Sequence, residues 1–258
     1  PVTTASRFKI GSVTKVFTAT LIHRFIEEGR LSYDTPISQF FPTYPNGKAI
    51  TVRNLLEHTS GIPEMLALPA VQQNMAHYWS PDELIGMVAK QPPLFRPGTR
   101  QLYCNTGFLM LAVIAEKVTG RTFAEQIREV FVDGLGMKTL LVGVDGAVVP
   151  RLTDGYSGKD GKMQLPIAAS IAIAMGTGNL EARPDDVVRL VNLDRLLKNR
   201  VLETLPLRPL VLTDGKEAVF TSQSDHYMSS ELDGCTLFLF SHPQIKLIGK
   251  LCSFPGLA

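Results

Sequence analysis

Apolar side chains recur at helical spacing over much of the chain. In residues 12–28 they return every third or fourth position, and Gly29 then provides a residue that suits a helix C-terminus. Residues 106–118 are apolar on nearly every side and end before Gly120, which is typical of a buried helix. Both segments are therefore predicted to be helices that contribute to the core.

Local signals at helix starts predict four more helices. Ser80 is followed by Pro81 and two acidic residues, a pattern typical of a helix N-terminus. Thr51 likewise provides an N-cap for a short helix. We expect these helices at residues 52–57, from 81 to before 92, at 122–131 and at 184–197.

Signals typical of strands concentrate near the C-terminal part of the sequence. Residues 218–221 and 235–240 have β-type character, and the second segment suits a buried strand. A short extended piece at residues 8–11 precedes the first helix. We therefore expect an α+β fold in a single domain over residues 1–258, with a helical region at about 16–200 packed on a small antiparallel sheet.

Composition and charge exclude several classes of protein. With 258 residues, 45% of them apolar and 19% charged, the chain can bury a large core and is not disordered. The net charge is +2 and no run of five basic residues occurs, so neither a nucleic-acid partner nor an anionic membrane surface is expected. The longest apolar stretches fall short of the roughly 18 to 20 residues that a membrane-spanning helix needs.

The cysteines and histidines predict no disulfide scaffold and no metal site. Three cysteines without a C-x-x-C spacing exclude a disulfide framework and a structural zinc ribbon. His23, His77 and His226 have no ligand spacing, and we interpret them as surface or half-buried residues. His58 and Ser60 lie two residues apart after a short helix, where bonds to backbone groups are expected.

A serine three residues before a lysine is the first candidate for catalysis. On a helix, Ser12 and Lys15 would share one face, so that the amine can accept the hydroxyl proton. Ser6 and Lys9 have the same spacing, which shows that the motif alone is weak. Ser12 is preferred because it follows a glycine and directly precedes the long apolar helix, whereas Ser6 precedes only the extended piece.

A tyrosine and an asparagine form the second candidate. Tyr103 and Asn105 lie two residues apart before a buried helix, so their side chains can point the same way. A phenol whose anion is stabilised by a nearby ammonium can act as a general base, and an asparagine can bond both a lysine and a substrate amide.

Four ordered segments carry a family resemblance. They are residues 8–15 (FKIGSVTK), 55–62 (LLEHTSGI), 97–105 (PGTRQLYCN) and 175–186 (MGTGNLEARPDD). Together they resemble the serine β-lactamase and penicillin-binding protein superfamily, in the branch of class C β-lactamases and D-alanyl-D-alanine carboxypeptidases, which also includes esterases. The similarity spans about residues 7–195.

The resemblance implies a role for each matching residue. Ser12 would be the acylated nucleophile, Lys15 its proton partner, Tyr103 the base and then the acid for the leaving group, and Asn105 an orienting donor to the substrate. The resemblance implies no metal and no organic cofactor, a small-molecule or peptide substrate, and a periplasmic or secreted location.

The third motif of the superfamily departs from its usual form. It normally reads Lys or His, a small residue and glycine on a strand that lines the site. Here the nearest match is Ser241-His242-Pro243, which makes His242 a candidate for substrate binding but lacks the glycine and a backbone donor at Pro243. Only 11 residues precede Ser12 and 16 follow His242, so the expected sheet looks truncated at both ends.

These observations predict a serine hydrolase that acts through an acyl-enzyme on the carbonyl of a β-lactam, an ester or a D-amino-acid peptide. Two alternatives stay open. The chain could be a catalytically silent binding or scaffold protein of the same fold, or an incomplete member that exchanges strands or dimerises. The oligomeric state is not predicted.

Overall fold

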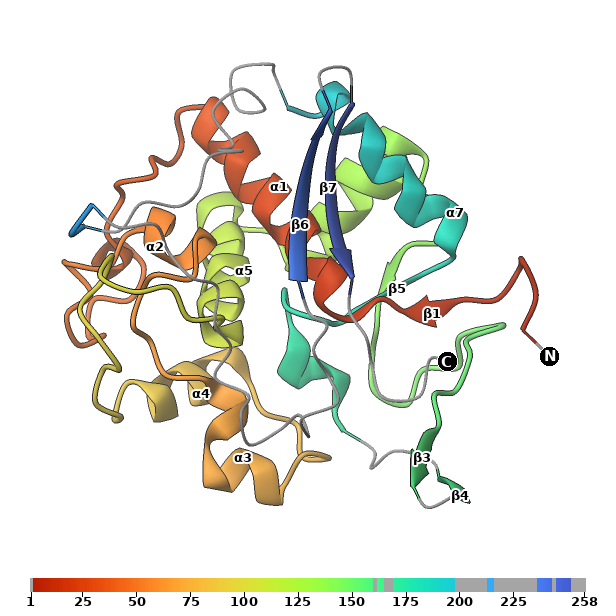
Figure 1. The fold of residues 1–258 in the computed structure, drawn as a ribbon, viewed down its shortest axis with the longest axis horizontal. Coiled ribbons are helices and arrows are strands. Elements are labelled where there is room, and N and C mark those ends of the chain that lie inside the picture. Colours follow the sequence, from red (N-terminus) through yellow and green to blue (C-terminus); the bar gives the residue numbers. More distant parts are fainter. Residues whose placement is uncertain are drawn as a thin grey trace.

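The computed structural model describes residues 2–159, 162–164, 169–197, 213–215, 236–242 and 245–251. Figure 1 shows the arrangement of its helices and strands. The α-helices are α1 (Thr14–Glu27), α2 (Val52–Leu56), α3 (Pro69–Gln73), α4 (Pro81–Val88), α5 (Asn105–Thr119), α6 (Phe123–Ile127) and α7 (Pro184–Val187). Short 3-10 helices lie at Gly11–Val13, Ile37–Gln39, Met65–Ala67, Ile171–Ala174 and Val188–Arg195, and a π-helical segment lies at Arg128–Asp133.

Residues that the sequence predicts to begin or end helices cap them in the structure. The Ser80 side chain accepts a hydrogen bond from the backbone N–H of Glu83 at the start of α4. Thr51 caps α2 in the same way, with Asn54 as its partner. At the end of α5, Gly120 has a φ of 70°, a conformation that glycine adopts without strain. The helices predicted at 12–28, 52–57, 106–118 and from 81 are confirmed within one to three residues at their ends.

Two predicted helices change character along their length. The helix expected at residues 122–131 is α-helical only to Ile127 and continues as the π-helical segment. The helix expected at 184–197 is α-helical only to Val187 and continues as a 3-10 helix, with non-helical angles at Asn192. The short helix α3 was not predicted.

The strands form three separate sheets among the described residues. The strands are β1 (Phe8–Lys9), β2 (Leu141–Val142), β3 (Ser157–Lys159), β4 (Lys162–Gln164), β5 (Leu180–Ala182), β6 (Thr236–His242) and β7 (Ile245–Leu251). Antiparallel pairing places β5 between β1 and β2, and β3 with β4 and β6 with β7 form hairpins.

The expectation of a sheet confined to the C-terminal part is wrong. β1, β2 and β5 form a small sheet from distant parts of the chain, with Phe8 opposite Ala182 and Leu141 opposite Glu181. β1 falls in the extended piece expected at residues 8–11, whereas β2 and β5 were not predicted, because strands of two or three residues are too short to show an alternating pattern. The strand expected at 235–240 is present as β6, and the one expected at 218–221 lies outside the described residues.

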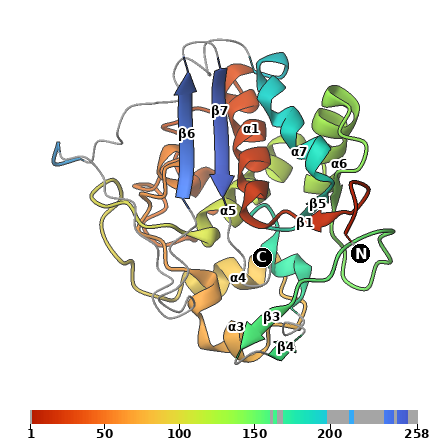
Figure 2. The same ribbon diagram turned by 45° about the vertical axis from the view of Figure 1, so that its right-hand side comes forward.

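The core lies around α1 and α5, which pack against each other. Phe17 and Leu21 of α1 are fully buried, and the Phe17 ring meets the Phe131 ring edge to face at 4.8 Å between centroids. Figures 1 and 2 show the β6–β7 hairpin beside α1, and β7 contacts the 3-10 turn Gly11–Val13 at the start of α1. The architecture is the helix-rich α+β fold that the sequence predicts.

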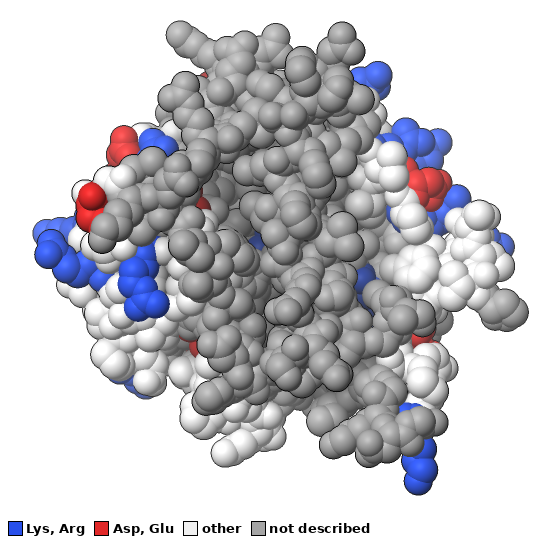
Figure 3. All heavy atoms as spheres, in the orientation of Figure 1, with Lys and Arg blue, Asp and Glu red and all other residues white. Residues whose placement is uncertain are grey.

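Charged side chains of both signs lie together on the flanks of the molecule. Figure 3 shows lysine and arginine side chains with acidic side chains among them on both sides of that view. This mixture agrees with the small net charge of +2. Within the described ranges, every helix is too short or too polar to cross a bilayer.

Candidate active site

Ser12 lies in the short 3-10 turn that leads into α1. Its neighbour Gly11 has a φ of 48°, so this turn uses a backbone conformation that residues with a Cβ rarely adopt. Ser12 is half-buried, whereas Lys15, one turn later on α1, is only 4% exposed. The three-residue spacing brings the Lys15 Nζ to 3.2 Å from the Ser12 Oγ, as the helical spacing predicts.

The Lys15 ammonium is held by oxygen atoms from three parts of the chain. Besides Ser12, it donates to the Oδ1 of Asn105 at 2.7 Å and to the backbone oxygen of Thr177 at 3.0 Å. The rings of Tyr103 and Phe108 lie 4.9 and 5.7 Å from the same nitrogen. A buried amine needs such partners, because removing it from water without them is costly.

Tyr103 is the second side chain that contacts the Ser12 hydroxyl. Its hydroxyl donates a hydrogen bond to the Ser12 Oγ at 2.8 Å. The His58 ring lies against the Tyr103 ring, with 4.6 Å between centroids, and His58 Nδ1 accepts the backbone N–H of Cys104 at 3.2 Å. His58 therefore supports the loop that carries Tyr103, and it bonds a backbone group as the sequence predicts.

Asn105 is the first residue of α5, so its backbone is fixed by the helix and not by a loop. Its Oδ1 accepts from Lys15, and its backbone N–H donates to the Glu64 Oε2 at 2.6 Å. Burial raises the pKa of Glu64, while hydrogen bonds from Asn105 and Leu66 and the charge of Lys15 oppose that shift.

Sequence reasoning missed two residues of this cluster. Thr177 acts through its backbone oxygen, so no side-chain pattern could reveal it, although it lies in the glycine-rich segment that carries the family resemblance. Glu64 contacts Asn105 across 41 positions of the chain, and no local spacing connects the two. The only sequence signal for Glu64 is an acidic residue two positions after the segment 55–62.

The other two serines considered in the sequence, Ser6 and Ser60, accept hydrogen bonds from backbone groups. Ser6 is buried and its Oγ accepts the backbone N–H of Thr3, while Lys9 is exposed. The Ser60 Oγ accepts the backbone N–H of Ile62. The preference for Ser12 over Ser6 therefore agrees with the geometry.

His242 is described only through its backbone. It is the last residue of β6 and pairs with Ile245 of β7. β7 contacts the turn that holds Ser12, but Figure 2 shows that the C-terminal end of β7 points toward the start of α1, whereas β6 ends at the opposite end of the hairpin. The position of the His242 side chain lies outside what the structure describes, so its role stays a prediction.

Cys104 lies between the two site residues Tyr103 and Asn105 but points elsewhere. Its thiol is buried and donates to the backbone oxygen of Ile62 at 3.3 Å. Burial, with the nearby charge of Glu64, raises its pKa to about 12. The thiol therefore stays protonated at neutral pH and is not a nucleophile of this site.

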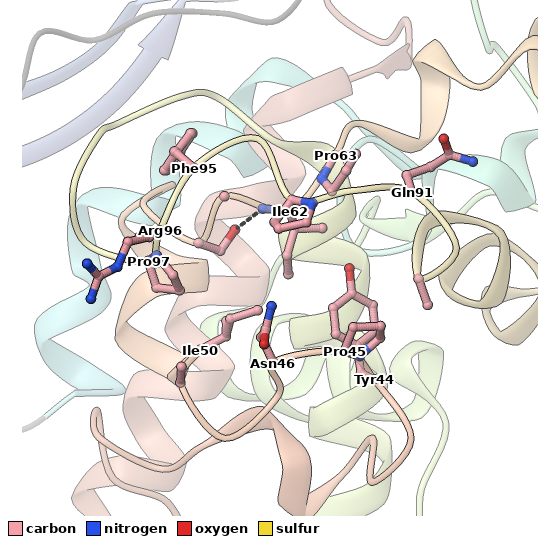
Figure 4. Close-up of a pocket in the computed structure, with 15 residues that line it drawn as sticks. Tyr44, Pro45, Asn46, Ile50, Ile62, Pro63, Gln91, Phe95, Arg96 and Pro97 are labelled. Atoms are coloured by element: carbon pink, nitrogen blue, oxygen red, sulfur yellow. Dashed lines mark hydrogen bonds between the residues drawn. The ribbon is translucent and has the colours of Figure 1, made fainter.

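A separate cavity is lined in part by the segment that follows α2. Figure 4 shows this cavity of about 390 Å³, which the side chains of Tyr44, Ile50, Ile62 and Phe95 line together with several prolines. None of the four clustered residues at Ser12 lines it. In the part of the chain that is described, no group of three or more His, Cys, Asp or Glu side chains is placed to hold a metal ion.

Comparison with known proteins identifies the family. The family model described as Beta-lactamase matches residues 1–233. The chain belongs to the beta-lactamase family. This membership confirms the resemblance to the serine β-lactamase and penicillin-binding protein superfamily that the four sequence segments indicate.

The proteins that this chain is similar to carry different names. The chain is 32% identical over 130 residues to penicillin-binding protein 4* of Bacillus subtilis, covering 50% of this chain and 29% of that protein. It is 30% identical over 165 residues to a beta-lactamase of Pseudomonas fluorescens, covering 63% and 44%. A D-stereospecific amidohydrolase from a Streptomyces species has a similar structure, with a TM-score of 0.70 at 27% identity, covering 80% and 66%. The chain thus spans about a third to a half of the two curated relatives.

Proposed function

We propose that the chain is a serine hydrolase that forms an acyl-enzyme at Ser12. The observation that carries this proposal is the position of the Ser12 Oγ, which lies 3.2 Å from the Lys15 Nζ and 2.8 Å from the Tyr103 hydroxyl. Two groups that can exchange protons thus flank one hydroxyl, an arrangement that activates a serine for attack. Membership of the beta-lactamase family supports the same function.

The reaction begins with proton transfer from Ser12. Either the unprotonated Lys15 amine or the Tyr103 phenolate accepts the hydroxyl proton as the Oγ attacks the substrate carbonyl carbon. The tetrahedral intermediate then collapses, the bond to the leaving nitrogen or oxygen breaks, and Tyr103 gives that atom a proton. Where Tyr103 was the base this is the proton taken from Ser12, and where Lys15 was the base the Lys15 ammonium returns that proton to the Tyr103 phenolate. A water molecule attacks the ester of Ser12 in a second cycle, releases the acid and restores the serine.

Two further groups would bind the reacting carbonyl. The backbone N–H of Ser12 would form part of the oxyanion hole. The Oδ1 of Asn105 accepts from Lys15, and its NH₂ group, which also bonds Glu64, is the proposed donor to the carbonyl of a substrate amide. His242 is the proposed third contact to the substrate on the strength of the sequence motif alone, because it lies at the closed end of the hairpin, where β6 ends and β7 begins.

The substrate class is proposed from the carbonyl chemistry and from the relatives. A β-lactam, an ester and a D-amino-acid peptide all present a carbonyl that a serine nucleophile can acylate. The relatives include proteins named for penicillin binding, for β-lactam hydrolysis and for D-stereospecific amide hydrolysis. A panel of benzylpenicillin, a nitrophenyl ester and matched D- and L-peptide amides would distinguish them by rate.

Labelling with a fluorophosphonate tests the proposal. Intact-protein mass spectrometry should show one adduct on the wild type, its loss in Ser12→Ala and its retention in Ser6→Ala, the matched control with the same spacing to a lysine. Prior incubation with benzylpenicillin should block the adduct if the site recognises β-lactams. An adduct that survives in Ser12→Ala would contradict the assignment of the nucleophile.

A silent binding protein is the second candidate. The sequence Ser241-His242-Pro243 favours it, because this segment lacks the glycine of the family's third motif and Pro243 has no backbone donor. A wild type that takes no adduct, while benzylpenicillin still raises its melting temperature, would support this candidate over the hydrolase.

A further inference from the structure

Glu64 is a buried residue whose carboxylate accepts a hydrogen bond from the start of α5. Its Oε2 accepts the backbone N–H of Asn105 at 2.6 Å, and its Oε1 accepts the backbone N–H of Leu66 at 3.1 Å. Thr106 strengthens the same junction, because its Oγ1 donates to the Pro63 oxygen at 2.7 Å and accepts the Met65 N–H at 2.8 Å. The segment around Glu64 is thereby tied to the first two residues of α5.

The carboxylate also stands next to the ionisable groups of the site. Glu64 is 9% exposed, and the charge of Lys15 on α1 lowers its pKa against the larger effect of burial. On the loop before α5, Cys104 interacts with the charge of Glu64, and the preceding residue, Tyr103, bonds Ser12 and packs on His58. Lys15 attracts the Glu64 carboxylate, and Asn105 bonds both residues.

We infer that Glu64 is a positioning residue for the acylation of Ser12. This inference rests on the proposed function. Glu64 holds the backbone of Asn105, Asn105 holds the Lys15 ammonium through its Oδ1, and Lys15 contacts the Ser12 Oγ. Glu64 would act on Ser12 through Asn105 and Lys15.

The negative charge of Glu64 determines the direction in which a Glu64 variant should shift the pH dependence of the acylation rate. Glu64 favours the protonated form of Lys15 and disfavours the phenolate of Tyr103, because like charges repel and opposite charges attract. Removing that charge lowers the pKa of either residue, so that its proton-accepting form is populated at lower pH. The acidic limb of the pH profile of the acylation rate should therefore move to lower pH, whichever of the two residues is the base.

Glu64→Gln separates this role from a purely structural one. The glutamine keeps the size of the side chain, but its NH₂ group must face one of the two backbone donors, so Asn105 is held less well. We expect the rate constant for fluorophosphonate labelling to fall about 10- to 100-fold at pH 8, the size of effect expected for a lost hydrogen bond to a charged group. We also expect the acidic limb to shift to lower pH over a profile from about pH 5 to 9.

Two variants control for folding and for loss of charge. Glu64→Asp keeps the charge with a shorter reach, so its rate should fall while its acidic limb stays where it is in the wild type. Asp186 is a buried carboxylate of α7 that also binds a backbone N–H, that of Thr139 at 2.6 Å. Asp186→Asn should lower stability and leave the acidic limb unmoved.

The outcomes distinguish failure of this inference from failure of the proposed function. A wild type that is labelled at Ser12, with Glu64→Gln at the same rate and the same pH profile, overturns the role of Glu64 alone. A shift of the acidic limb in Glu64→Asp or Asp186→Asn as large as in Glu64→Gln would also overturn it. A wild type that takes no adduct overturns the proposed function and this inference together.

Discussion

At the residue scale, Lys15 shows how an amine is kept inside the protein. An ammonium group has three N–H donors, and here they meet the Ser12 hydroxyl, the Asn105 amide oxygen and the Thr177 backbone oxygen. Each acceptor comes from a different segment, so all three segments must fold before the lysine is satisfied. The same contacts that make burial tolerable therefore hold the amine at the serine.

His23 provides a pH-dependent test of stability that is separate from the site. It is buried on α1, where its Nδ1 lies 3.0 Å from the Tyr33 hydroxyl, and burial lowers its pKa from 6.5 to about 4. This corrects the expectation of a surface or half-buried position. Between these two pH values the unfolded chain binds a proton that the folded chain does not, so stability falls as pH falls from 6.5 to about 4.

The predicted loss is about 3 kcal/mol over that interval, from a shift of about two and a half pKa units. Urea unfolding of the wild type and of His23→Gln at several pH values measures it. The glutamine can still bond Tyr33 but does not titrate, so its stability should depend less on pH. An unchanged slope in His23→Gln would contradict the prediction, and the exposed His77→Gln serves as the control that should match the wild type.

The sequence predicted the residues of the site that carry a local pattern or a family motif. Ser12 and Lys15 were visible because three positions on a helix place them on one face. Glu64 and the Thr177 oxygen were not visible, because their contacts join segments that are distant in the chain. Such contacts depend on tertiary packing, which a spacing rule does not contain.

At the element scale, the turn before β5 determines where the Thr177 oxygen lies. Gly176 has a φ of 68°, its backbone oxygen accepts from the Thr18 hydroxyl at 2.7 Å, and a Cβ added to it would overlap the Cβ of Ala112 on α5. The turn is thus pressed between α1 and α5, and only glycine fits without a shift of one of these helices.

Gly176→Ala should therefore lower the free energy of unfolding by about 3 kcal/mol, the sum of a left-handed backbone cost and overpacking. It should also slow labelling of Ser12, because the Thr177 oxygen that holds Lys15 moves with the turn. Gly86→Ala is the matched control, since Gly86 is exposed on α4 with open space around it. That control should raise stability by about 0.5 to 1 kcal/mol in the same urea titration. Equal stability of the two variants would contradict this account of the turn.

Helices were predictable and the small sheet was not, for a physical reason. Helix ends depend on contacts within four residues, as the caps at Thr51 and Ser80 show. The sheet of β1, β5 and β2 joins strands of two or three residues from positions far apart in the chain. Its stability comes from pairing and burial, which no short window of sequence contains.

At the scale of the whole molecule, the candidate site lies where independent parts of the fold meet. The start of α1 brings Ser12 and Lys15, the start of α5 brings Asn105, and the turn before β5 brings the Thr177 oxygen. Helices α1 and α5 pack directly on each other, so the core fixes the distance between these groups. Activity and stability should therefore respond together to changes at the α1–α5 contact.

The most direct test of the central claim is to locate the labelled residue. After fluorophosphonate treatment, trypsin should release residues 10–15 as one peptide, because Lys9 and Lys15 bound it, and fragment ions distinguish Ser12 from Thr14 within it. The account predicts a single adduct on Ser12. An adduct on any other residue, or an unlabelled peptide from a folded protein, would contradict it.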